Sequence, residues 1–111
     1  MHPAIVNLVF RAQRVALVTD AVAWAGGGDA PRLPNGTLMG STLTADAAVR
    51  NVVHHCQVAL TDAVRAASTT PAELLGLHDC GRIALGARAD LVALTPDLTV
   101  EQTWVGGRTR G

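Results

Sequence analysis

Apolar side chains recur every three to four residues in two long stretches of the chain, the spacing of one face of a helix. The first stretch runs from Pro3 to Gln13, where a proline suits the first helical turn. The second runs from Leu43 to Gln57, and Thr44 is its predicted N-cap. This second stretch has the clearest apolar stripe, formed by Val49, Val52, Val53 and Cys56.

Two shorter helices are predicted further along the chain. One runs from about Thr61 to Ala67, with Thr61 as its N-cap. The other is predicted by Thr70-Pro71-Ala72-Glu73, where a capping residue, a first-turn proline and an acidic residue form a capping box. This helix is expected to end at Gly76.

Short apolar runs predict the strands. Val15 to Val18 is continuous, β-branched and too short for a helix, which is typical of a strand buried on both faces of a parallel sheet. Near the other end, Leu91 to Leu94 and Val100 to Val105 predict two strands joined by a turn at Pro96-Asp97. We interpret these two as a hairpin of a separate β layer, which needs further strands to pack on.

Asp20 follows the Val15 to Val18 run, at the position where that strand should end. The carboxyl ends of parallel strands are where catalytic side chains gather in α/β folds and above all in (β/α)8 barrels. Asp20 is therefore a candidate catalytic base. A turn or N-cap aspartate would give the same local pattern, and this stretch alone leaves both interpretations open.

The composition indicates that the chain does not form a complete enzyme by itself. Its 111 residues are too few for a whole (β/α)8 barrel, which needs about 200 or more. The chain is 49% hydrophobic and 16% charged, and much of the apolar content is alanine, which buries little area. Such a chain should expose apolar surface unless a partner or the rest of a larger fold covers it.

The charge pattern argues against several partners. The formal net charge is zero without a cluster of basic residues, so neither nucleic acid nor a membrane surface is expected as a partner. No run is long enough to span a bilayer, and the first residues lack the features of a signal peptide. Cys56 and Cys80 do not form a metal or disulfide motif, so a cytoplasmic protein with reduced, buried thiols is expected.

Other chemically suggestive residues are better explained structurally, and we predict no metal site in this chain. His54 and His55 are adjacent, about 100° apart on a helix, and so cannot chelate one ion as an i, i+4 pair does. His78, Asp79 and Cys80 are neighbours in a turn, and His2 fits a surface or capping role. The glycines at 26–28 match no phosphate-binding pattern.

Several motifs together resemble a known family. Gly81-x-Ile83-x-x-Gly86-x-x-Ala89-Asp90-Leu91-Val92 resembles the C-terminal return of amidohydrolase-superfamily enzymes, where the chain leaves the barrel and rejoins a small β-sandwich. Five further stretches, in order, are similar to N-acetylglucosamine-6-phosphate deacetylases: Leu17-Val18-Thr19-Asp20-Ala21, Asn35 to Ser41, Ala48 to Asn51, Ser68-x-x-Pro71-Ala72, and Thr103 to Gly107. The resemblance covers nearly all of this chain but corresponds to the C-terminal part of the family's length.

The resemblance implies an α/β fold: residues 1–80 would be the last strand and helices of an incomplete TIM-type barrel, and 81–111 strands of the small β-sandwich. It implies a hydrolase that converts N-acetylglucosamine 6-phosphate to glucosamine 6-phosphate and acetate, with a divalent metal such as zinc activating the water. Asp20 matches the residue that takes a proton from the water and returns it to the leaving amine. Leu38, Met39 and Gly40 match the loop that contacts the sugar.

The departures from the family pattern imply that the isolated chain is inactive. The family's metal ligands and most of its sugar and phosphate ligands lie upstream of the matched part. The segment between Ala21 and Asn35 is also shorter than usual. Water without a metal has a pKa of about 15.7, against about 7 when bound to a suitable ion, a gap worth roughly 12 kcal/mol. A carboxylate alone does not close that gap.

Two classes of function therefore remain. In the first, the chain is the C-terminal part of an amino-sugar-phosphate deacetylase and acts with the missing metal-binding half of the barrel. In the second, it is a non-catalytic remnant that serves as an interaction or structural module, self-associating through an exposed strand. A part of another amidohydrolase is a lesser enzyme alternative, because the closing motif around Gly81 to Val92 is widespread.

Overall fold

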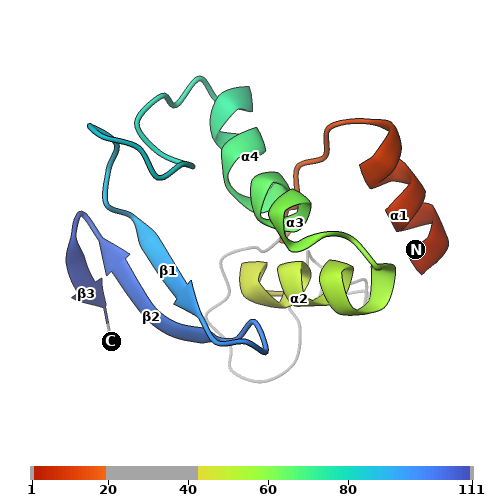
Figure 1. Cartoon of the computed structure of the whole chain (residues 1–111). Helices are drawn as coiled ribbons and strands as arrows, with labels where there is room; N and C mark the ends of the chain where they lie inside the picture. The colour runs from red at the N-terminus through yellow and green to blue at the C-terminus, as the bar shows by residue number, and fades with distance from the viewer. Residues whose placement is uncertain (1, 20–42, 111) are drawn as a thin grey trace, which may run out of the picture.

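The computed structural model describes residues 2–19 and 43–110. In this part of the chain, helices come first and a small sheet follows (Figure 1). The elements are α1 (Pro3–Ala12), α2 (Ala45–Cys56), α3 (Leu60–Ala67), α4 (Thr69–Leu74), β1 (Leu91–Leu94), β2 (Val100–Val105) and β3 (Arg108–Arg110). No helix among these is long and apolar enough to cross a membrane.

The core lies among the first three helices. Its buried members are the α2 residues Val49 and Val52, together with Val58 and Ala63. Phe10 of α1 and Leu17 pack against them from the N-terminal side, and Val53 and Cys56 complete the α2 stripe. The apolar spacing predicted for this helix is therefore confirmed, with one face of α2 turned into the core.

The sheet is three-stranded and antiparallel, in the order β1-β2-β3. β1 pairs with β2 in a register that places Leu91 opposite Trp104, with an irregularity between Ala93 and Leu94. β2 turns back into β3 through two glycines with positive φ, Gly106 at 58° and Gly107 at 81°. The strands expected at 91–94 and 100–105 are confirmed, and β3 was not predicted.

The ends of the shorter helices differ from the prediction. α3 begins at Leu60 behind an Ala59 cap, so Thr61 is not its N-cap. The reason lies in the preceding turn, where Gln57 adopts a left-handed φ of 59° and Val58 is buried, which fixes the entry into α3. α4 begins at Thr69 behind Ser68, so Thr70 lies inside the helix, where it is buried.

The two longer helices begin where the sequence predicts. His2 caps α1, because its Nδ1 accepts a hydrogen bond of 3.1 Å from the Ala4 amide. This confirms the capping role expected for His2. Thr44 occupies the N-cap of α2, but its side chain forms no capping bond with the backbone. The acidic first-turn residue Asp46 favours the positive end of this helix.

The strand predicted from Val15 to Val18 is not formed with any of the described residues. Residues 14–19 form no strand with any other part of the chain that the structure describes. Their backbone is held by a helix instead, since the Leu17 amide donates to the Ala66 carbonyl at 2.8 Å. A parallel strand requires neighbouring strands to supply its hydrogen bonds, and the three described strands pair only within their own sheet, β1 with β2 and β2 with β3.

A turn-rich connection links α4 to the sheet (Figure 1). The Thr69 hydroxyl donates to the Gly81 carbonyl, and the Arg88 amide donates to the Asp79 carbonyl at 2.7 Å. Gly81 has a φ of +80°, and a β-carbon there would lie 2.7 Å from the Ala72 β-carbon. The close approach of this connection to α4 therefore requires glycine at position 81.

Candidate functional site

The four site residues predicted from the sequence lie outside the described residues. They are Asp20, Leu38, Met39 and Gly40, all within the segment 20–42. Their roles stay predictions. The structure instead describes the two ends of the chain that flank this segment.

The N-terminal flank is held against the helices up to Leu17. The Leu17 side chain packs on the core, and its amide is bonded to the Ala66 carbonyl of α3 at 2.8 Å. The next residue, Val18, is 72% exposed. The contacts of Leu17 thus anchor the N-terminal flank three positions before Asp20 in the sequence.

The C-terminal flank is the start of α2, where the carboxylate of Asp46 is held by two hydrogen-bond partners. The Thr44 hydroxyl and the Arg50 guanidinium both form hydrogen bonds to the Asp46 carboxylate and lower its pKa from 3.8 to about 2. Arg50 Nη1 lies 2.8 Å from Asp46 Oδ2. Asp46 therefore stays ionised to a lower pH than an ordinary aspartate and serves as an anchor for Arg50.

The described residues do not fit a metal ion. Residues 2–19 and 43–110 contain no group of three histidine, cysteine or carboxylate side chains close enough to bind one. His54 and His55 are exposed, and Cys56 and Cys80 are free thiols that are partly buried.

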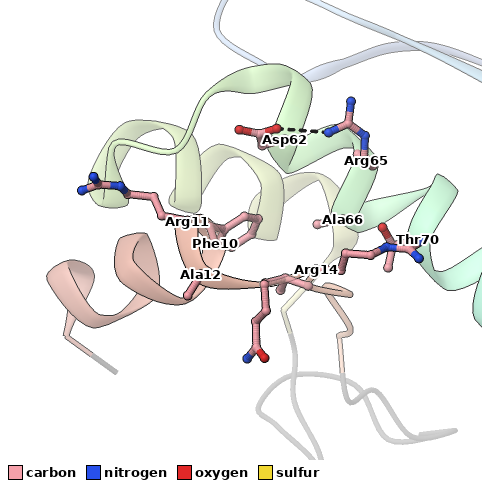
Figure 2. A pocket seen from close by; sticks show the side chains of 10 residues that line it. Phe10, Arg11, Ala12, Arg14, Asp62, Arg65, Ala66 and Thr70 are labelled. Carbon is pink, nitrogen blue, oxygen red and sulfur yellow. Dashed lines mark hydrogen bonds and ion pairs between the residues drawn. The ribbon is translucent and has the colours of Figure 1, made fainter.

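A cavity of about 340 Å³ lies between the end of α1, the segment that follows it, α3 and the start of α4 (Figure 2). Three arginines line it, Arg11, Arg14 and Arg65, with a single carboxylate, Asp62. Sequence reasoning missed this feature, because the arginines are separated by up to 54 positions in the numbering and form no basic cluster along the chain.

The helices and the antiparallel sheet together define a small α/β protein. A family model described as "Amidohydrolase family" matches residues 3–110, almost the entire chain. The chain therefore belongs to the amidohydrolase family, as the motifs from Gly81 to Val92 led us to expect.

Within that family the similar proteins are deacetylases of N-acetylated amino-sugar phosphates. A putative N-acetylgalactosamine-6-phosphate deacetylase of Escherichia coli K12 is 36% identical over 126 aligned positions, covering 97% of this chain and 75% of that protein. The N-acetylglucosamine-6-phosphate deacetylase of Vibrio furnissii is 34% identical, covering 97% of this chain and 32% of that protein. Both alignments exceed the 111 residues of this chain, so these relatives contain residues without a counterpart here.

The solved structures that this chain resembles are also deacetylases of this kind. The N-acetylglucosamine-6-phosphate deacetylase of Pasteurella multocida matches 99% of this chain with a TM-score of 0.86 and 28% identity, over 34% of that protein. A mutant of the Mycobacterium smegmatis enzyme, solved in complex with N-acetyl-D-glucosamine 6-phosphate, matches with a TM-score of 0.81 and 33% identity. Apart from the E. coli K12 protein, this chain spans about a third of the length of these relatives.

Proposed function

We propose that this chain is the C-terminal part of a deacetylase that hydrolyses N-acetylglucosamine 6-phosphate, or its galactosamine counterpart, to the free amine and acetate. The observation that carries the proposal is the match of residues 3–110 to the amidohydrolase family, together with close structural similarity to deacetylases over 99% of the chain. In this proposal residues 1–80 belong to the last part of a TIM-type barrel and 81–111 to the small β-sandwich. The complete enzyme would work in the cytoplasm.

The proposal assigns Asp20 the proton transfers of the reaction. As the water oxygen bonds to the acetamide carbon, the Asp20 carboxylate accepts a proton from the water. When the carbon–nitrogen bond breaks, that proton passes to the departing amine, and acetate is released. Leu38, Met39 and Gly40 are proposed to contact the sugar. The metal that the family implies would be held by residues outside the described part of this chain.

Exposed apolar side chains support the need for a complementary part. The buried core consists of alanine, valine and one leucine, and no large side chain among the described residues is fully buried. In contrast, Leu74, Leu75, Ile83 and Leu85 are between 72% and 106% exposed. Covering a leucine or isoleucine side chain contributes about 1.5–3 kcal/mol, so these positions favour association with further structure.

We propose that the missing metal-binding half of the barrel covers this surface, which we define by Leu74, Leu75, Ile83 and Leu85. The same half would supply the neighbouring strand that Val15 to Val18 needs in order to pair. A parallel strand gains its hydrogen bonds as soon as such a neighbour is present. This segment, which pairs with no strand among the described residues, would then become the last strand of the barrel.

The test is a complementation experiment. The chain is mixed with the Pasteurella multocida deacetylase lacking the 34% of its length that this chain matches, in the presence of zinc, and acetate release is measured. Both N-acetylglucosamine 6-phosphate and N-acetylgalactosamine 6-phosphate are supplied, which decides between the two substrates. We expect a one-to-one complex and activity that neither part has alone.

A double variant in the proposed contact surface tests whether this surface forms the complex. Ile83→Asp combined with Leu85→Asp changes two side chains that are 91% and 106% exposed, so the isolated chain should keep its circular dichroism spectrum. The variant is expected to lose the complex, because charged groups would have to be buried at the contact. A complex that forms normally with this variant would contradict the proposed contact surface. Absence of both complex and activity with the unchanged chain would favour the non-catalytic alternative.

A further inference from the structure

We infer that a second apolar face of α1, formed by Ile5, Leu8 and Ala12, binds the part of the deacetylase that this chain lacks. The inference rests on the proposed function and adds to it a contact surface on a different helix. It is argued from the sequence of α1, from the contacts that orient this helix, and from the exposure of its outer side chains.

The helix α1 is apolar almost all the way round. After Pro3, only Asn7 and Arg11 interrupt its apolar sequence. A helix with apolar residues on every side is normally covered on every side. In the part of the chain that the structure describes, however, no residue of α1 is fully buried.

One face of α1 packs on the rest of the chain. Val6 and Phe10 contact the core, and the Asn7 side-chain amide donates to the carbonyls of Cys56 and Gln57 at 2.9 Å and 3.2 Å. These contacts at the end of α2 fix the rotation of α1 about its own axis. They therefore decide which of its side chains point away from the core.

Ile5, Leu8 and Ala12 lie on the other side of α1. At about 100° per residue they fall within about 60° of one another, and roughly 150° from the direction of Val6 and Phe10. Ile5 is 51% exposed, Leu8 is 62% exposed, and Ala12 is also exposed. Residues at this spacing form the apolar stripe of a helix that packs against another surface, whereas a helix face turned to solvent carries polar side chains.

The comparisons favour the missing part of the deacetylase as the occupant of this face. The structural match to the Pasteurella multocida enzyme covers 99% of this chain, so it includes α1, but it covers only 34% of that protein. The helix α1 therefore has a counterpart in an enzyme whose larger part has no equivalent here. That larger part can supply the apolar surface that covers Ile5, Leu8 and Ala12.

This face of α1 is separate from the surface defined by Leu74, Leu75, Ile83 and Leu85. The helix α1 lies on one side of α3, and the connection from α4 to β1 lies on the other (Figure 1). The missing part would therefore contact the chain from two sides. Substitutions in the two surfaces should then weaken the complex independently, and their effects on the dissociation constant should multiply.

The test measures the dissociation constant between the whole chain and the Pasteurella multocida deacetylase lacking the 34% of its length that this chain matches. Ile5→Asp places a carboxylate in the first turn of α1, which holds no acidic residue and where negative charge stabilises a helix. Leu8→Glu introduces a good helix former three residues before Arg11, a spacing that also supports the helix. Each variant should weaken binding at least about tenfold, because a charge replaces an apolar side chain at the contact.

Two control variants separate this face from general effects of charge and volume. Leu8→Met keeps an apolar side chain of similar volume and should bind like the unchanged chain. Asn51→Asp adds a negative charge at an exposed position of α2 and should also bind normally. Circular dichroism of each isolated variant checks that its helices are retained.

The outcomes distinguish this inference from the proposed function. If the unchanged chain forms an active complex and both Ile5→Asp and Leu8→Glu bind it normally, the inference is wrong and the proposed function stands. Equal weakening by Asn51→Asp would also overturn the inference, because the effect would then be one of charge alone. If the unchanged chain forms no complex, the proposed function fails and this inference fails with it. A dimer of the isolated chain that Leu8→Glu abolishes would show that a second copy covers this face instead.

Discussion

Arg50 of α2 donates a hydrogen bond of 2.9 Å from Nη1 to the carbonyl of Leu98 in the turn between β1 and β2. The same nitrogen lies 2.8 Å from the Asp46 carboxylate, which holds the guanidinium in place. Leu98 is buried and has a φ of +63°, a conformation that a leucine rarely adopts. Arg50 therefore joins the helices to the sheet at a turn whose backbone depends on tertiary support.

Removing this link should lower stability more than removing an exposed ion pair. Arg50→Met keeps the length of the side chain but loses the hydrogen bond to Leu98, at an expected cost of about 1.5–3 kcal/mol. Arg65→Met loses only the exposed pair with Asp62, at a cost of about 0–1 kcal/mol. Urea unfolding of both variants measures the difference. Equal midpoints would mean that the bond between Arg50 and Leu98 contributes nothing.

The Asp46 carboxylate should make stability depend on pH in the acid range. Its pKa is lowered to about 2 in the folded chain by the Thr44 hydroxyl and by Arg50, from an ordinary value of 3.8. The stabilisation is therefore fully present above about pH 4 and is lost as the pH falls toward 2. Asp46→Asn should lower the Tm at pH 5, and the difference from the wild type should disappear near pH 2.

The matched control for this pH dependence is Asp97→Asn. Asp97 is exposed in the turn between β1 and β2 and forms no ion pair with any described residue. The Tm of the Asp97→Asn variant should equal that of the wild type from pH 5 to pH 2. If the difference in Tm between Asp46→Asn and the wild type stays constant down to pH 2, the pKa of Asp46 is not lowered in the folded chain.

Gly81 should tolerate alanine much less well than Gly76. Both have a positive φ, 80° and 71°, so alanine at either position costs about 1 kcal/mol for the left-handed backbone. At Gly81 the new β-carbon would also lie 2.8 Å from the Ser68 carbonyl oxygen, whereas at Gly76 nothing lies within 4 Å. In thermal unfolding, the Tm of Gly81→Ala should be clearly lower than the Tm of Gly76→Ala. The reverse order would show that the connection can move away from α4.

Ala63 should resist enlargement because it is completely buried in the core. Ala63→Leu adds three carbons between α2 and α3 and is expected to cost about 1–3 kcal/mol through overpacking. Val64→Leu, one position further along the same helix and 41% exposed, should cost little. Chemical denaturation of the pair tests this, and a stabilised Ala63→Leu would mean that the core contains unfilled space.

The sequence predicted those helices and strands whose apolar pattern lies within their own residues. α2 follows from one apolar stripe, and β1 and β2 follow from short β-rich runs. β3 was missed because Arg108-Thr109-Arg110 contains no apolar residue, and its pairing depends on the glycine turn before it. The Val15 to Val18 run has the composition of a strand, but strand formation needs a partner that the described residues do not provide.

The candidate sites were predictable to different degrees. Asp20 and the Leu38 to Gly40 loop come from motifs, and as residues outside the described part of the chain they remain predictions. The arginine-lined cavity could not be predicted, because Arg11 and Arg65 come to line it only through the packing of α1 and α3 around the common core. Spacing along the chain gives no sign of such a cavity.

The most direct test of the central claim is the rate of acetate release by the complemented enzyme when Asp20 is replaced. Asp20→Asn should leave the complex intact and lower kcat by about 10²–10⁴-fold, the usual contribution of general acid–base catalysis. Asp97→Asn, at an exposed turn, should leave kcat unchanged. A complemented enzyme that keeps its full kcat with Asp20→Asn would contradict the account.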